Sequence, residues 1–248
     1  MSQFVDSIRL IFQARDSVSG GVQIGGLGEF GQLTASHLGV SLVAVLVAVA
    51  IAVPLGLYLG HIGKGEFLAI SLSNIGRAVP SLALLAFFVV FLGIGFANVT
   101  VVLVLLAIPP ILTNTYVGIR QVERDTVDAA RGQGMTETQI VRRVELPLAL
   151  PLIFGGIRTS AVNVVATATI APLANVPTLG TPIIEPQTYG FTGQIAAAIV
   201  VALITVAADA GLGAVQRAVT PRGIKLAREA SAGRRFSLSS LLRREQPT

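Results

Sequence analysis

The chain has 248 residues, of which 52% are hydrophobic and 12% are charged, and its net charge is +5. Soluble domains usually carry about a quarter charged residues, so this composition excludes an ordinary soluble protein and favours a lipid bilayer as the solvent. The lack of cysteine excludes disulfides and thiolate metal sites, and the basic residues lie in tails and beside apolar runs, which argues against nucleic-acid binding.

The N-terminal region, residues 1–35, is predicted to hold a short helix and a connector. Apolar residues recur at helical spacing between positions 4 and 12, which is typical of an amphipathic helix that lies on a membrane surface or packs against the protein's own spans. The Gly-rich stretch 19–31 predicts a flexible connector. No continuous apolar core of a cleavable signal peptide occurs in residues 1–33.

Five apolar segments follow within residues 36–218, and each is close to the roughly 20 residues that a spanning helix needs. Their ranges are about 38–59, 67–92, 99–117, 148–173 and 192–215. The consecutive prolines Pro109 and Pro110 remove backbone hydrogen bonds, so this part of the third segment is expected to face the protein interior. The only histidines, His37 and His61, lie at opposite ends of the first segment and are not expected to share a metal ion.

The basic residues alternate between successive connections. The turn 61–66 contains Lys64, residues 119–147 contain five arginines, and eight basic residues lie between 217 and 244. The turn 93–98 and the loop 173–191 contain none. Because cytoplasmic loops are enriched in Lys and Arg, this pattern predicts an N-terminus outside and a C-terminus inside. Residues 219–248 are predicted to form a basic cytoplasmic tail, mostly without fixed structure.

A polar insertion at 119–147 separates the third and fourth segments. Residues 120–131 are good helix formers, and Gly132 and Gly134 are expected to end that helix. Thr136 and Gln139 have the spacing of a capping box, which predicts that a second helix begins there.

The second helix of the insertion is predicted to be amphipathic. We expect its apolar face to consist of Ile140, Val141 and Val144, and its solvent face to consist of Arg142, Arg143 and Glu145. Pro147 is expected to stop this helix and to start the fourth span.

This insertion resembles the coupling segment of the permeases of binding-protein-dependent ABC importers. The pattern of that family is Glu-Ala-Ala, three residues, Gly, nine residues, Ile, one residue, Leu-Pro; in this chain Asp128 replaces the Glu and Val144 replaces the Ile. The resemblance implies an all-α membrane protein with a type I ABC importer permease-like bundle. It also implies contact with an ATPase through Asp128, Ala129, Ala130, Gly134, Met135, Thr136, Val144, Leu146 and Pro147.

Four further segments look like the glycine betaine, carnitine and choline branch of that family: residues 37–42, 54–56, 80–85 and 155–158. The branch often carries Gly-Ala-Gly-Gly-Leu-Gly after the fourth span, and only Leu179-Gly180 match that run here. The resemblance implies a bacterial cytoplasmic-membrane importer for a small compatible solute. The implied partners are two ATPase subunits, a second permease subunit that is identical or paralogous, an extracytoplasmic solute-binding protein or lipoprotein, and membrane lipid.

Two functions of an importer are expected on partner proteins rather than on this chain: ATP hydrolysis and high-affinity solute selection. The chain lacks the Gly-rich loop that binds nucleotide phosphates, so ATP and Mg are expected on a partner ATPase, and this chain is expected to bind no cofactor and catalyse no reaction. It has no Trp and only Tyr58, Tyr116 and Tyr189, which are expected to lie at different depths. Because a quaternary ammonium is usually held by an aromatic cage, high-affinity selection is expected in the external binding protein.

Three charges fall within apolar segments. Arg158 and Asp209 are expected at similar depths near the cytoplasmic side, and we predict that they pair in a structural role rather than a gating one. Arg77, beside Pro80 and Ser81, is a candidate for the solute pathway or its gate, although it can also reach inward to water.

Polar residues also recur every fourth position on the fourth segment, at Thr159, Asn163 and Thr167. Such a stripe lines a route or bonds neighbouring helices, and both interpretations remain open. Three other functions remain open as well: a permease for another small solute such as an amino acid, an ion-coupled carrier or channel, and a non-transporting scaffold. No convincing inverted repeat favours the carrier.

Overall fold

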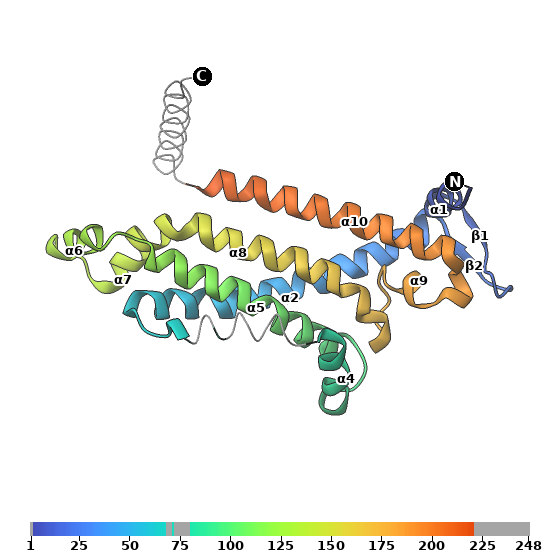
Figure 1. The fold of residues 1–248 in the computed structure, drawn as a ribbon, viewed down its shortest axis with the longest axis horizontal. Coiled ribbons are helices and arrows are strands. Elements are labelled where there is room, and N and C mark those ends of the chain that lie inside the picture. Colours follow the sequence, from blue (N-terminus) through green and yellow to red (C-terminus); the bar gives the residue numbers. More distant parts are fainter. Residues whose placement is uncertain (1, 68–70, 72–79, 221–248) are drawn as a thin grey trace, which may run out of the picture.

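The computed structural model describes residues 2–67, 71 and 80–220. The described part is a helical bundle with one small hairpin (Figure 1). Its elements are α1 (Ser2–Phe12), β1 (Ala14–Asp16), β2 (Gln23–Gly25), α2 (Gly26–Ile62), α4 (Ser81–Leu92), α5 (Phe96–Arg120), α6 (Arg124–Gly132), α7 (Glu137–Ile140), the π-helix Val141–Glu145, α8 (Leu146–Thr167), the 3₁₀-helix Ala168–Ala174, α9 (Thr181–Ile184) and α10 (Pro186–Val219).

Four described helices are long and apolar enough to cross a membrane: α2, α5, the continuous helix 137–174, and α10. Each overlaps one predicted span. The other predicted span, 67–92, falls largely outside the described residues, and its described end is the 12-residue apolar helix α4. The candidate pathway residue Arg77 also lies outside the described residues.

Small residues bring α2 and α5 into close contact. One face of α2 repeats them every fourth position, and all five are buried: Ala44, Ala48, Ala52, Gly56 and Gly60. A Cβ atom added at Gly56 would lie 2.7 Å from the Cβ atom of Thr115 on α5. Because lipid offers no hydrophobic drive for helix association, such small-residue faces stabilise spans through tight van der Waals packing.

The prediction that the double proline faces the interior is confirmed. Pro109 is buried, and the carbonyl groups near the prolines receive side-chain hydrogen bonds. Ser160 Oγ on α8 donates to the Ala107 carbonyl at 2.7 Å, and Asn114 Nδ2 donates to the Pro110 carbonyl at 2.8 Å. A Cβ atom at Gly156 of α8 would lie 2.8 Å from that Pro110 oxygen, so α8 packs directly on the proline turn.

The N-terminal region differs from the flexible connector that the sequence predicted. Strands β1 and β2 pair antiparallel, with Arg15 opposite Ile24, and α2 begins directly afterwards at Gly26. The glycines at 25 and 26 have φ values of 84° and 78°, so they supply a left-handed turn rather than mobility. The hydroxyl of Tyr189 on α10 donates to Glu29 on α2, which fixes this end of the bundle.

Helix α1 packs against α10 and α2, which favours the second of its two predicted placements. Leu10 is buried in that contact, whereas Phe4 and Phe12 are exposed. Helix α10 kinks at Gly190, where φ is 64° and ψ is −178°. The N-terminus and the hairpin lie at one end of the bundle, and α6 and α7 lie at the other (Figure 1).

Candidate functional site

The polar insertion forms a compact projection at the end of the bundle opposite the N-terminus (Figure 1). Helix α5 ends at Arg120, and α6 begins at Arg124. The predicted uninterrupted helix over 120–131 was therefore wrong: residues 121–123 form a break, because Val122 turns inward and is buried against Val127 and Ile140. Gly134, with φ of 81°, then reverses the chain toward α7.

The predicted capping box at the start of α7 is confirmed. The backbone N–H of Thr136 donates to Gln139 Oε1 at 2.9 Å, and the backbone N–H of Gln139 donates to Thr136 Oγ1 at 3.4 Å. Both bonds satisfy backbone donors that the first turn of a helix otherwise leaves unpaired. The α7 start is therefore held by local chemistry.

Pro147 does not stop the second helix, contrary to the prediction. Helix α7 continues through the π-helix Val141–Glu145 into α8, and the backbone N–H of Leu146 donates to the carbonyl of Val141, five residues earlier. A proline normally clashes with the carbonyl four residues before it, and a π turn takes up one extra residue there. The same turn carries Glu145 inward, so its predicted place on the solvent face was also wrong.

The residues of the predicted coupling segment fall into three groups by burial. Ala130 belongs to the buried cluster with Val122, Val127 and Ile140, and Met135 and Val144 pack against that cluster. Leu146 and Pro147 are half-buried. The remaining predicted residues are exposed and form the outer surface of the projection: Asp128, Ala129, Gly134 and Thr136.

A charged network joins the projection to the end of α2, and the sequence analysis did not predict it. His61 Nδ1 lies 2.8 Å from Glu145 Oε2, and His61 Nε2 lies 3.1 Å from Glu137 Oε2. Arg131 donates two hydrogen bonds to Glu137, at 3.0 and 3.1 Å, and a third to Asp128 at 2.9 Å. The available sequence signal was the position of His61 in the last turn of α2, directly after Gly60.

The pairing of Arg131 with Glu137 has electrostatic consequences. The hydrogen bonds from Arg131, assisted by its charge, lower the pKa of the exposed Glu137 carboxyl group, and Glu137 in turn raises the pKa of Arg131. Both groups therefore stay charged at neutral pH. The network joins all three elements of the projection: α6 contributes Asp128 and Arg131, α7 contributes Glu137, and the π-helix contributes Glu145.

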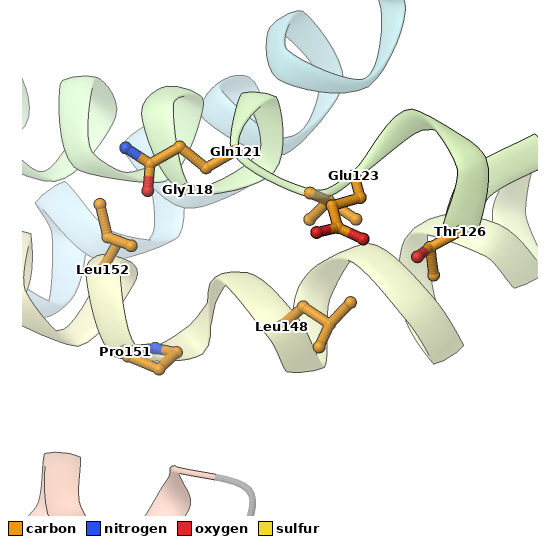
Figure 2. A pocket seen from close by; sticks show the side chains of 8 residues that line it. Gly118, Gln121, Glu123, Thr126, Leu148, Pro151 and Leu152 are labelled. Atoms are coloured by element: carbon orange, nitrogen blue, oxygen red, sulfur yellow. The ribbon is translucent and has the colours of Figure 1, made fainter. Parts of the chain in front are cut away.

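A groove of about 340 Å³ runs beside the projection between α5 and α8. Figure 2 shows Glu123 and Thr126, at the start of α6, on one side and Leu148 and Pro151 of α8 on the other. One wall is thus polar and the other apolar. Protein–protein interfaces commonly combine an apolar centre with a polar rim in this way.

The described candidate pathway residues lie at the start of α4 and on α8. Pro80 is exposed and precedes α4, whose first residue, Ser81, is half-buried. On α8, Asn163 is exposed and Thr167 is half-buried. The face of α8 that carries Asn163 is therefore not covered by the described part of the same subunit.

Arg158 and Asp209 are brought together. Arg158 donates two hydrogen bonds to the two carboxylate oxygens of Asp209, which joins α8 to α10. Gln216 Nε2 adds a second link by donating to the Pro151 carbonyl at 2.7 Å. The side chains of the ion pair are 38% and 39% exposed, so the pair lies at the edge of the subunit rather than in its core.

We expect Thr136→Ala to loosen the coupling segment without unfolding the bundle. Loss of an N-cap side chain costs about 1 kcal/mol, which corresponds to about fivefold faster opening of the first turn of α7. Hydrogen exchange of the amides of Gln139 and Ile140, which bond the hydroxyl and the carbonyl of Thr136, measures this change. Thr138→Ala, an exposed position inside the same helix, is the matched control; equal exchange in the two variants would show that the cap does not hold α7.

Comparison with known proteins places these features in a family. Residues 28–223 match the family model described as "Binding-protein-dependent transport system inner membrane component". The choline transport system permease protein OpuBB of Bacillus subtilis is 40% identical over 205 residues, which cover 82% of this chain and 94% of that protein. The osmoprotectant import permease protein OsmY of Salmonella typhimurium is 33% identical over 192 residues, covering 76% and 81%.

Solved structures give the same assignment of fold. An inward-facing structure of the MetNI methionine ABC transporter superposes with a TM-score of 0.68 at 21% identity, covering 79% of this chain and 98% of that one. An amino acid ABC transporter with histidines gives a TM-score of 0.60, also at 21% identity, covering 77% and 94%. Because residues 28–223 match that family model and the bundle has the fold of a type I importer permease, the chain belongs to the family of inner membrane components of binding-protein-dependent transport systems.

Proposed function

We propose that this permease imports a small compatible solute of the glycine betaine, choline or carnitine type, driven by ATP that a separate subunit hydrolyses. The observation that carries the proposal is the projection at one end of the bundle, which presents Asp128, Ala129 and Gly134 on its outer surface. A buried apolar cluster and a capping box hold that surface in shape. It is therefore suited to receive force from a docked partner.

The course of the chain supports a mechanical role. Because α7, the π-helix and α8 form one continuous helix, a displacement of the projection is transmitted directly into a membrane span. ATP-driven closure of two ATPase subunits would push on residues 128–147 and swing the spans between inward-facing and outward-facing states. ATP and Mg would remain on the ATPases, and no step of the chemistry is assigned to this chain.

The orientation belongs to the same proposal. The projection would lie in the cytoplasm together with the C-terminal end of α10, and the N-terminus with its hairpin would lie outside. The alternation of basic residues supports this orientation. A second permease subunit would cover the exposed polar face of α8 that carries Asn163. Charged and polar groups at membrane depth normally face protein or water rather than lipid, which supports a partner there.

The proposed solute class rests on the similarity to known permeases, and the proposed place of solute selection rests on the positions of the three tyrosines. The choline and osmoprotectant permeases named above are 40% and 33% identical to this chain. Tyr58 is exposed on α2, Tyr116 is buried, and Tyr189 is bonded to Glu29, so these three do not form an aromatic cage. Selection of a quaternary ammonium solute would therefore occur mainly in an extracytoplasmic binding protein, which delivers it to the permease.

The proposal is tested by replacing Gly134, whose φ of 81° disfavours any β-branched side chain. We expect Gly134→Val to reduce co-purification of the ATPase, and ATP-dependent uptake of radiolabelled choline or glycine betaine, by about tenfold, since a left-handed residue costs roughly 1–2 kcal/mol. Gly132→Val is the matched control, because Gly132 is equally exposed and has no positive φ. Full uptake by Gly134→Val without ATP would contradict an ATP-driven importer.

A further inference from the structure

His61 lies where α2 meets the coupling segment. It occupies the last turn of α2, and its side chain is 16% exposed. One ring nitrogen faces Glu145, whose side chain is 6% exposed, and the other faces Glu137, whose side chain is 56% exposed. A single side chain of a membrane span therefore contacts two elements of the coupling segment, α7 and the π-helix.

The hydrogen-bond geometry specifies the form of the ring. A neutral imidazole has one N–H donor and one acceptor nitrogen, and a carboxylate can only accept. Glu145 Oε2 lies 2.8 Å from His61 Nδ1, so Nδ1 carries a hydrogen and donates it to that buried carboxylate. Glu137 Oε2 lies 3.1 Å from Nε2 and also accepts a hydrogen bond from Arg131.

The surrounding charges come from every element packed around the ring. Arg131 of α6 bonds Glu137, and a small cavity of about 30 Å³ beside His61 and Glu145 is lined by Arg120 of α5 and by Arg124 and Arg131 of α6. These arginines are not within hydrogen-bond distance of Glu145 among the contacts of the described residues, whereas His61 is. His61 is therefore the direct partner of that buried carboxylate.

We propose that His61 is a positioning residue that clasps the coupling segment to α2. The coupling segment is covalently continuous with α8 and, through residues 121–123, with α5, but its direct link to α2 depends on side chains. With the clasp closed, a push on the projection moves α2 together with α5 and α8, and the Gly56 and Gly60 contacts keep α2 and α5 together. With the clasp open, the push reaches α2 only through its packing against α5 and α8. This inference rests on the proposed function, since it concerns how force from an ATPase is shared among the spans.

The test uses the assembled importer in proteoliposomes, with ATP hydrolysis and uptake of radiolabelled choline and glycine betaine measured in the same preparation. We expect His61→Ala to keep ATPase co-purification and hydrolysis within about twofold of wild type, while uptake per ATP falls about tenfold. Glu145→Gln should lower uptake per ATP in the same way. The double variant should be no worse than His61→Ala alone, because the two residues act through one contact.

Lys64→Ala is the matched control, since it removes a neighbouring exposed cation that makes no ion pair among the described residues. Rescue by a conservative variant supplies a readout that a merely structural role would not move. His61→Gln retains a hydrogen-bond donor toward Glu145 and should recover part of the uptake per ATP that His61→Ala loses. His61→Gln also keeps the charged groups around the ring: Glu137, Glu145, Arg120, Arg124, Arg131, Arg142 and Asp128.

Two results would overturn the inference. One is unchanged uptake per ATP in both His61→Ala and His61→Gln; the other is loss of ATPase co-purification in both, which would make His61 a docking or folding residue. Neither result would be confused with failure of the proposed function. If that function is wrong, the wild type itself will show no ATP-dependent uptake and no ATPase partner, whatever residue stands at position 61.

Discussion

Asp209→Asn is expected to lower the amount of folded permease in the membrane several-fold. The substitution leaves Arg158 without its carboxylate partner. At 1.5 Å per residue, position 209 lies about 15 Å along α10 from Val219, the last residue of that helix. A lone intramembrane charge is costly, and it can be relieved only by reaching water or by moving the helix. Membrane-fraction immunoblots and size-exclusion profiles of the purified subunit measure the loss.

The decisive control removes both charges. Arg158→Leu combined with Asp209→Leu should recover most of the lost protein, because replacing a whole ion pair with apolar residues costs far less than removing one partner. Recovered protein with poor uptake would assign the pair a transport role in addition to the structural one. Wild-type abundance and uptake in Asp209→Asn would refute the structural pairing.

Gly56→Ala is expected to destabilise the bundle by about 1–3 kcal/mol, the usual cost of overpacking a close contact. The added methyl group would lie 2.7 Å from Thr115 Cβ and 3.1 Å from the Leu112 carbonyl oxygen, so α2 and α5 would have to move apart. The thermal midpoint of the detergent-purified protein is the measurement.

Gly39→Ala provides the comparison within the same helix. Gly39 is exposed, and a Cβ atom there meets nothing within 4 Å. Because Ala favours a helix over Gly, this variant should be as stable as the wild type or slightly more so. Equal destabilisation by the two substitutions would mean that the loss comes from α2 itself rather than from its contact with α5.

The features that the sequence predicted well are those set by local chemistry or by the solvent. The apolar segments could be predicted as spans from their length. The capping box could be predicted from the spacing of Thr136 and Gln139 alone. The pairing of Arg158 with Asp209 followed from a simpler constraint: two opposite charges at similar depth in lipid have few other partners.

The features that it missed depend on tertiary structure or on backbone geometry without a sequence signal. His61 and Glu145 are 84 positions apart, and nothing local brings them together. The glycines at 25 and 26 were interpreted as part of a flexible connector, because the sequence does not reveal the positive φ values that they adopt in the folded hairpin. Pro147 looked like a helix stop, since a π turn has no residue pattern that distinguishes it from an ordinary one.

The π turn sets the rotational phase of the coupling segment relative to its span. Each residue of an α-helix advances the side-chain direction by about 100°, and a π turn absorbs one residue beyond the α-helical repeat. Without that residue, everything on the N-terminal side of Val141 would face about a quarter turn away. Ile140 would leave its apolar cluster, and Glu137 would point away from α2. The orientation of the coupling segment toward the ATPase thus depends on the one extra residue that the π turn contains.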